Sequence, residues 1–368
     1  MRRPDRRALS IQLLIYLAVA AIAVGAALFA IETLHARGIK AGFGFLWNTA
    51  GFDIGFTLIP FDATSSYGRA FLAALLNTLL VSALAIALAT VVGMVVAVAR
   101  LAPIPAIRCA GTTYVEAIRN TPLLLQLLAL YFLLLGVLPP PRQSIALGVV
   151  LINNRGVFLP SPTMTPDAWL AALALLALFV YYRLTVRRRL PGRAPLLAAS
   201  AGAGALGLAT MGLMQWDVPM LSGLNVRGGI ALVPELAVLV IALGIYTAAF
   251  VAETFRSGFL SIPPGQWEAG AALGLGRRMT LRLVILPQAV RACLPPLANQ
   301  YVNVIKASSL AAAIGFPDLM QVFGKTTLNQ TGQAVEVIAM TMAVYLAISM
   351  AIAGTTQWVE RRGWPAGG

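Results

Sequence analysis

Residues 265–287 read GQWEAGAALGLGRRMTLRLVILP, a polar and basic stretch between two strongly apolar segments. Two prolines just before it end the preceding helix, because proline lacks an amide hydrogen and clashes with the helical turn before it. Residues 266–275 then predict a helix of about two and a half turns. Gly274 and Gly276 are placed to end it. Three arginines follow, and they indicate that the stretch faces the cytoplasm.

Composition places this stretch in a membrane protein. Of 368 residues, 59% are hydrophobic and only 11% are charged, whereas soluble domains contain about a quarter charged residues. The net charge of +14 could suggest nucleic acid as a partner. However, the charges lie in short clusters between apolar segments and form no long basic face. We therefore expect contact with membrane lipid and no nucleic-acid partner.

Apolar segments of roughly the 20 residues that a bilayer requires recur along the chain. They predict an all-α membrane protein with about eight spanning helices. The first segment could instead be a secretory signal peptide, although its apolar run is longer than usual. The predicted spans are 8–31, 71–99, 114–138, 168–182, 194–214, 228–258, 288–314 and 334–359.

The basic residues give this layout an orientation. With the N-terminus in the cytoplasm, 19 arginines and lysines fall in cytoplasmic segments and 7 in periplasmic ones. This asymmetry agrees with the positive-inside rule. It predicts that residues 183–193 and 265–287 are cytoplasmic and that residues 32–69 and 139–167 are periplasmic.

The sequence offers no candidate group for a cofactor, a metal or a catalytic site. His35 is the single histidine, and Cys109 and Cys293 fall in or beside predicted cytoplasmic segments, where a structural disulfide is not expected. Residues 324–326 (GKT) look like the end of a phosphate-binding loop, but the glycine required five residues earlier is Leu319. We therefore expect no cofactor and no ATP site in this chain, which is then not an enzyme.

The loop at 265–287 resembles the EAA loop of ABC-importer permeases, which forms a short coupling helix that docks into a groove on the ATP-binding subunit. Two positions depart from the motif: Gly270 stands for alanine and Val284 for isoleucine. An ordinary cytoplasmic loop remains the alternative. The resemblance implies a role in ATPase coupling for Gly265, Gln266, Glu268, Ala269, Gly274, Leu286 and Pro287.

Two further stretches resemble the polar amino-acid permeases within that family. EAIRNTPLLLQ at 116–126 is similar to the family's E-x-x-R-N-x-P-L-L-x-Q, and residues 246–256 are similar to its Y-x-x-A-F-x-x-E-x-x-R. The acid and base three residues apart could also form a plain interfacial ion pair. The positions given a structural role are Glu116, Arg119, Asn120, Pro122, Glu253 and Arg256.

Polar side chains inside the apolar spans are candidates for the substrate pathway, because such groups are costly in a membrane and usually face a cavity or a partner. Lys306 could meet a substrate carboxylate or an acidic partner, or it could snorkel or form a structural pair. The uncharged candidates could equally be hydrogen bonds between helices. The full set is Asn77, Thr78, Gln126, Lys306, Ser308 and Ser309.

Taken together, the resemblance implies a type I ABC-importer permease of the bacterial inner membrane that carries L-amino acids. Residues 41–70 and 139–162 are similar, more loosely, to the Q-type permease subunit of general L-amino-acid importers. The expected architecture is a five-helix core with an added N-terminal helix and a two-helix insertion. The expected partners are two copies of an ATP-binding subunit, a second and different permease chain, and a periplasmic amino-acid-binding protein.

We divide the chain accordingly into four parts: an N-terminal helix and periplasmic loop (1–69), the first part of the permease core (70–138), a periplasmic loop with the inserted hairpin (139–229), and the second part of the core with the coupling loop (230–368). A secondary transporter driven by an ion gradient is the main alternative. It would leave the coupling loop unexplained, and ATP dependence of uptake separates the two. A membrane-embedded enzyme is disfavoured because no catalytic cluster is visible.

Overall fold

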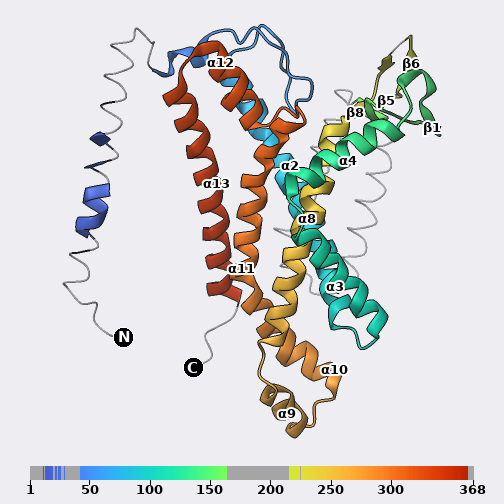
Figure 1. Ribbon diagram of the computed structural model, residues 1–368, viewed down its shortest axis with the longest axis vertical. Coiled ribbons are helices and arrows are strands. Elements are labelled where there is room, and N and C mark those ends of the chain that lie inside the picture. The colour runs from blue at the N-terminus through green and yellow to red at the C-terminus, as the bar shows by residue number, and fades with distance from the viewer. Residues whose placement is uncertain are drawn as a thin grey trace, which may run out of the picture. The chain divides into compact units, whose positions relative to one another are not determined.

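The computed structural model describes residues 42–163, 215–223 and 225–363, together with isolated helical positions between Ile11 and Phe29 (Figure 1). Two compact units are present, Met1–Leu128 with Val238–Gly368, and Ala129–Ala237. The predicted spans at 168–182 and 194–214 lie outside the described residues. The four-part division of the chain remains a proposal.

The first unit is built from helices. Among the described residues, four helices are long and apolar enough to cross a membrane, or five if a bent pair counts as one span. Helices α11 and α13 pack along each other (Figure 1). The elements are η1 (Phe43–Trp47), α2 (Tyr67–Leu101), α3 (Pro105–Arg119), α4 (Leu123–Val137), α8 (Pro234–Leu260), α9 (Gly265–Ala272), α10 (Arg277–Thr280), η4 (Leu281–Ile285), α11 (Leu286–Ala307), η5 (Ser308–Ala313), η6 (Met320–Thr327), α12 (Leu328–Thr331) and α13 (Ala334–Gly363).

Helix α2 packs through small side chains. Ala85 and Ala89, one turn apart, are fully buried along one face. Gly93 continues that face, and a Cβ atom added there would lie 2.6 Å from Cγ1 of Val251 on α8. Small residues let helices approach closely in a membrane, where lipid is as apolar as a leucine side chain. The close approach of α2 and α8 therefore depends on glycine at position 93.

The third predicted span is wrong as a single helix. The structure has α3 ending at Arg119 and α4 starting at Leu123, so the expected span at 114–138 is a bent pair. The stretch between the predicted spans at 71–99 and 114–138 is largely helical too, because α2 continues to Leu101 and α3 already starts at Pro105. Proline is well tolerated in a first helical turn, which explains this early start. Pro122 disfavours the helical conformation for the residue before it, which explains the break.

The second unit contains short antiparallel strands that the sequence analysis did not predict. Each has only three or four residues, too few to show the alternation that identifies a strand. One sheet has the order β1-β2-β3-β8, and β4–β5 and β6–β7 form two separate ladders. The elements are η2 (Pro141–Gln143), β1 (Ile145–Leu147), β2 (Val150–Asn153), β3 (Gly156–Leu159), β4 (Ser161–Thr163), β5 (Gln215–Asp217), β6 (Met220–Ser222), β7 (Asn225–Arg227) and β8 (Ile230–Leu232).

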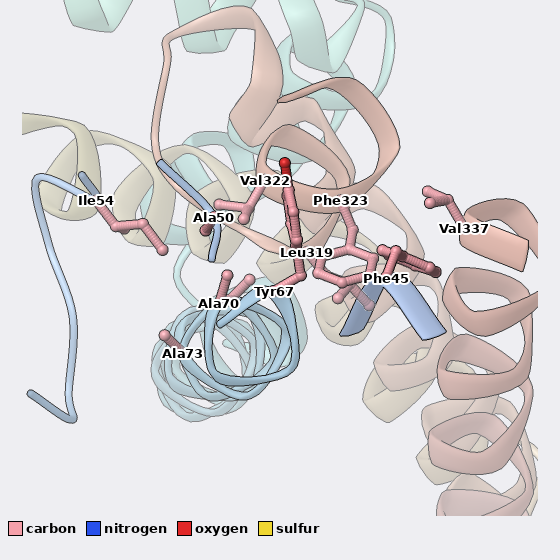
Figure 2. Packing of buried hydrophobic residues seen from close by; sticks show 11 residues of the cluster. Phe45, Ala50, Ile54, Tyr67, Ala70, Ala73, Leu319, Val322, Phe323 and Val337 are labelled. Carbon is pink, nitrogen blue, oxygen red and sulfur yellow. The ribbon is translucent and has the colours of Figure 1, made fainter. Parts of the chain in front are cut away.

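An aromatic cluster closes the first unit at the N-terminal end of α2. Figure 2 shows Phe45, Tyr67 and Phe323 gathered beside the alanines of α2. The centroid of the Phe45 ring lies 5.9 Å from the centroid of the Tyr67 ring and 6.4 Å from that of the Phe323 ring. The segment before α2, expected as a mixed loop, is thereby packed against η6 and α13.

Candidate functional site

Helix α9 is the predicted short helix of the 265–287 loop, and it begins directly after the two prolines. The amide hydrogens of Gln266 and Trp267 bond to the carbonyls of Pro263 and Pro264, which starts the first turn. Glu268 lies in that turn and is exposed. A carboxylate there interacts favourably with the positive end of the helix. The Glu268 side chain is therefore free to meet a partner.

A Schellman motif ends α9. The Gly274 amide bonds to the Ala271 carbonyl, and the Leu275 amide bonds to the Gly270 carbonyl. Gly274 has a φ of 74°, a conformation that glycine adopts without strain and that costs other residues about 1–2 kcal/mol. The prediction that this glycine ends the helix is confirmed by its backbone.

Gly270, a departure from the EAA motif, is explained by close packing onto α10. A Cβ atom at position 270 would lie 2.4 Å from Cγ2 and 2.7 Å from Oγ1 of Thr280. Thr280 is buried, and its hydroxyl donates to the carbonyls of Leu275 and Gly276 at 3.3 Å each. The threonine thus occupies the space that an alanine at position 270 would need.

The residues between α9 and α11 form a surface that is both basic and apolar. Leu273 is 79% exposed and Leu283 is 63% exposed. The arginines at 277, 278 and 282 are also exposed.

The amide nitrogen of the Gln288 side chain on α11 donates to the Gln266 side chain at 3.1 Å, which links α9 to α11. Pro287 lies at the start of α11, where its missing amide hydrogen costs nothing. Leu286, which precedes it, is 48% exposed, and the motif positions Gly265 and Ala269 on α9 are exposed as well.

An ion-pair network connects α2 to α8 just before this loop. Both Arg100 on α2 and Arg256 on α8 bond to the carboxylate of Glu253, with Arg256 Nη2 at 2.6 Å. The Arg100 side chain is 13% exposed and the Glu253 side chain 29%. Removing one partner of a partly buried pair leaves uncompensated charge, so the network resists separation of the two helices. Arg100 lies just after the predicted span at 71–99, and the sequence alone assigned it no role.

The E-x-x-R-N-x-P motif surrounds the break between α3 and α4. No ion pair joins Glu116 to Arg119 in the part of the chain that the structure describes. The Arg119 guanidinium instead lies 5.0 Å from the centre of the Phe250 ring. The backbone amide of Asn120 donates to the Glu116 carbonyl at the end of α3. Gln126 donates to the carbonyls of Ile118 and Thr121 at 3.0 Å each. Its amide thus satisfies carbonyls that the Pro122 break leaves without helical partners.

Asn77 and Thr78 are fully buried and bond to backbone groups of distant segments. The Asn77 amide donates to the Phe56 carbonyl at 2.8 Å and to the Pro317 carbonyl at 2.9 Å. Thr78 Oγ1 accepts from the Leu319 amide at 2.9 Å. These bonds fix the turn before η6 to α2, and they leave no donor of Asn77 for a substrate.

Lys306 and Ser309 line a hollow of about 640 Å³ between the end of α11, η6 and α13. Lys306 is exposed and is the penultimate residue of α11, near its C-terminal end. Ser309 donates to the Lys306 carbonyl at 2.7 Å, whereas Ser308 is buried and donates to Ile305. Two of the six pathway candidates thus share one cavity, and the others do not line it. The lining residues are Lys306, Ser309, Met320, Gly324, Leu328, Ile338, Thr341, Met342, Tyr345, Leu346 and Ser349.

Sequence reasoning missed Asp318 and Tyr345 beside this hollow. Asp318 is fully buried, although it lies in a stretch that reads as a loop. Tyr345 lies in an apolar span, where a tyrosine resembles any interfacial aromatic residue. The one available signal was an acid close to the predicted span at 288–314, and an acid at the end of a span is by itself a weak signal.

Known proteins are similar to this chain over most of its length. Residues 89–363 match the family described as "Binding-protein-dependent transport system inner membrane component". The chain is 44% identical to the putative amino-acid ABC transporter permease protein YhdX of Escherichia coli (strain K12), over 98% of this chain and 94% of that protein. It is 40% identical to the general L-amino acid transport system permease protein AapQ of Rhizobium johnstonii, over 88% and 83% of the two chains.

Among solved structures, the chain is similar to one titled as an amino acid ABC transporter with histidines. The TM-score is 0.50 and the sequence identity 23%, with 80% of this chain and 95% of that chain covered. At this identity the likeness concerns the fold alone. It agrees with the helical architecture of the first unit.

The contact between Gly270 and Thr280 yields a test of the loop structure. Gly270→Ala restores the motif alanine but overpacks the contact, at about 1–3 kcal/mol. We expect α9 and α10 to open more often, so that trypsin cleaves after Arg277 and Arg278 about fivefold faster or more. Gly270→Ala combined with Thr280→Ala should regain most of the wild-type resistance, and Thr280→Ala alone is the control. Wild-type cleavage rates in Gly270→Ala would contradict the packing described.

Proposed function

Because the chain belongs to the family of binding-protein-dependent transport system inner membrane components, we propose that it is the permease subunit of an ATP-driven importer of L-amino acids. The family supplies the membrane component, the dependence on a binding protein and the inner-membrane location. The names of the relatives from Escherichia coli and Rhizobium johnstonii support amino acids as the substrate class. A secondary transporter is not favoured.

The observation that carries the coupling role is the exposed, rigidly terminated helix α9. Its carboxylate Glu268 and the apolar Leu273 face outward, and the Schellman turn fixes its end. An exposed leucine beside exposed arginines is typical of a surface that a partner covers. We assign this surface to the ATP-binding subunit, with two such subunits serving two permease chains. The second permease chain is proposed to be a different one.

The chain itself, an ion pair and a hydrogen bond connect α9 to the spanning helices. Helix α8 leads directly into the loop, and Glu253 on α8 holds Arg100 at the end of α2. The Gln266–Gln288 bond joins α9 to α11. When the ATP-binding subunits close, these contacts carry the displacement of α9 into α2, α8 and α11, and the permease alternates between inward-facing and outward-facing states. The binding protein then releases its amino acid into the outward-facing state.

The coupling role is tested by variants of α9 that leave the spanning helices unchanged. Glu268→Ala removes the outward carboxylate, and Gly274→Ala forces a side chain into the φ of 74°. Both variants should insert into the membrane normally. Both should lower ATPase association or substrate-stimulated ATP hydrolysis in proteoliposomes that contain the ATPase and the binding protein.

Gly276→Ala is the matched control for this experiment. Gly276 has open space around its Cα, as Gly274 has, but its φ of −62° suits any residue. Gly276→Ala should therefore keep wild-type hydrolysis. Full uptake and full stimulated hydrolysis in both Glu268→Ala and Gly274→Ala would remove the coupling proposal.

For the substrate pathway we propose the hollow beside α11 and α13, with Lys306 as the group that meets the substrate carboxylate. Its walls are mostly apolar, and Lys306 is the only charged side chain among the described residues that line it. A cation in an apolar cavity favours an anionic group. The hydrogen bonds of Asn77, Thr78 and Gln126 to backbone carbonyls and amides instead support structural roles. The buried Ser308 hydroxyl, which donates to the Ile305 carbonyl, supports a structural role as well.

Lys306→Met tests this pathway, because it keeps the length of the side chain and removes its charge. A charged hydrogen bond contributes about 1.5–3 kcal/mol, so we expect the maximal uptake rate to fall by about tenfold or more. Lys325→Met is the control, since Lys325 is exposed on η6 and does not line the hollow. Normal uptake by Lys306→Met at wild-type expression would rule out the pathway role.

A further inference from the structure

A second hollow, of about 530 Å³, lies where the chain enters α2, and we call it the α2 hollow. Leu46 and Trp47 of η1 line it on one side, and the first turns of α2 line it on the other. A Cβ atom at Gly68 would lie 3.2 Å from the Leu46 carbonyl oxygen, so η1 and α2 approach closely there. Helix α2 is long and apolar enough to cross a membrane. The α2 hollow therefore lies at the end of a membrane span.

Arg69 is the only charged side chain among the described residues that line the α2 hollow. Its Nε donates to the Pro60 carbonyl at 2.7 Å, which holds the guanidinium in place. Its two Nη groups make no hydrogen bond or ion pair within the described part of the chain. The nearest acid in the sequence, Asp62, accepts hydrogen bonds from Thr64 and Ser65 instead. A guanidinium with both terminal groups free matches the geometry of a phosphate.

Ser66 brings a second hydrogen-bond donor to the same place. Its Oγ accepts the Arg69 amide hydrogen at 3.3 Å and thereby caps α2. Its own hydroxyl hydrogen has no acceptor among the residues that the structure describes. Trp47 also lines the α2 hollow and is 87% exposed. Tryptophan is enriched at the level of lipid headgroups, because its ring is apolar and its N–H is polar.

A leucine stripe, formed by Leu72, Leu76 and Leu79, runs from the α2 hollow along α2. These leucines follow Arg69 at spacings of three, four and three residues, which place all four on one helical face. Leu72 is 53% exposed and Leu79 is 38% exposed. The stretch from Arg69 to Leu79 rises about 15 Å, which is half of the roughly 30 Å of a bilayer's hydrocarbon core. The face is thus charged at one end and apolar over the depth of one leaflet.

We propose that the α2 hollow binds an anionic phospholipid, with Arg69 and Ser66 on the phosphate oxygens and one acyl chain along the leucine stripe. A free anion would satisfy Arg69 but would leave the leucine stripe uncovered. A zwitterionic headgroup would bring its own cation close to the guanidinium, and no described lining residue is acidic. The charge of the site and its continuation into a membrane span therefore both favour an anionic lipid.

A lipid in this position joins η1 to α2. Phe45 of η1 in turn lies against Phe323 of η6, with ring centroids 6.4 Å apart. Filling the α2 hollow removes open space between η1 and α2, so we expect the bound lipid to raise the thermal unfolding temperature. The site requires neither Lys306 nor the coupling loop, and it stands or falls independently of them.

The test titrates the purified full-length chain in detergent with phosphatidylglycerol and measures bound lipid by native mass spectrometry. Phosphatidylcholine with the same acyl chains is the lipid control, because its headgroup has no net charge. We expect phosphatidylglycerol to bind about tenfold more tightly or better, since a hydrogen bond between charged groups is the stronger kind. Inorganic phosphate at millimolar concentration should not displace the lipid, because it lacks the acyl chain.

Ser66→Asp is the sharpest variant, because aspartate caps a helix as well as serine does. It places a negative charge against the phosphate, so phosphatidylglycerol binding should weaken by about tenfold or more. Ser66→Asn is the matched control, since asparagine also caps α2 and carries no charge. It should bind the lipid within about twofold of wild type. All three proteins should unfold at the same temperature when lipid is absent.

Arg69→Gln removes the charge and keeps an N–H donor for the Pro60 carbonyl. It should also weaken phosphatidylglycerol binding by about tenfold or more. Arg142→Gln is its control, because Arg142 is exposed on η2 and does not line the α2 hollow. This control should bind the lipid as wild type does.

Three results would overturn the proposal, each in its own way. Equal phosphatidylglycerol binding by wild type, Ser66→Asp and Arg69→Gln would mean that Arg69 merely extends to the membrane surface. Displacement of the lipid by inorganic phosphate would make the α2 hollow a site for small anions. Loss of the lipid whenever a second permease chain is copurified would make this face a protein interface.

Discussion

The structure depends on one constraint: backbone amides and carbonyls inside a bilayer must find partners within the protein. Unbroken helices meet it by themselves, and each helix break needs a side chain to replace the missing bonds. Gln126 does so at the Pro122 break, where its amide donates to two carbonyls. Asn77 and Thr78 do so at the turn before η6. Polar side chains within the spans are therefore first of all supports for irregular backbone.

This constraint explains how far the sequence predicted the fold. The long spans, the short helix α9 and its end at Gly274 follow from local rules on apolar runs, proline and glycine, and the family match confirms the permease class. The bent α3–α4 pair was read as one helix because the apolar run continues across Pro122. The strands between α4 and α8 are too short to show a period.

The candidate sites divide in the same way. The coupling loop could be located from sequence because its residues are contiguous and its motif has a fixed spacing. The environment of Asp318, Tyr345 and Lys306 could not be located from sequence, because it brings together the end of α11, the turn between η5 and η6, and α13. Burial of Asp318 is a tertiary property, and a lone acid after a phenylalanine and a proline carries little local signal. The pairing of Arg100 with Glu253 is likewise separated by 153 positions.

Photo-crosslinking from α9 is the most direct test of the proposal that this chain receives force from an ATP-binding subunit. A photoreactive amino acid at Leu273, which is 79% exposed, should form an adduct with the ATPase in membranes, and the yield should change with ATP. The same group at Val91, which is 63% exposed on the spanning helix α2, should form none. Absence of the ATPase adduct at position 273, or equal adducts at both positions, would contradict the account.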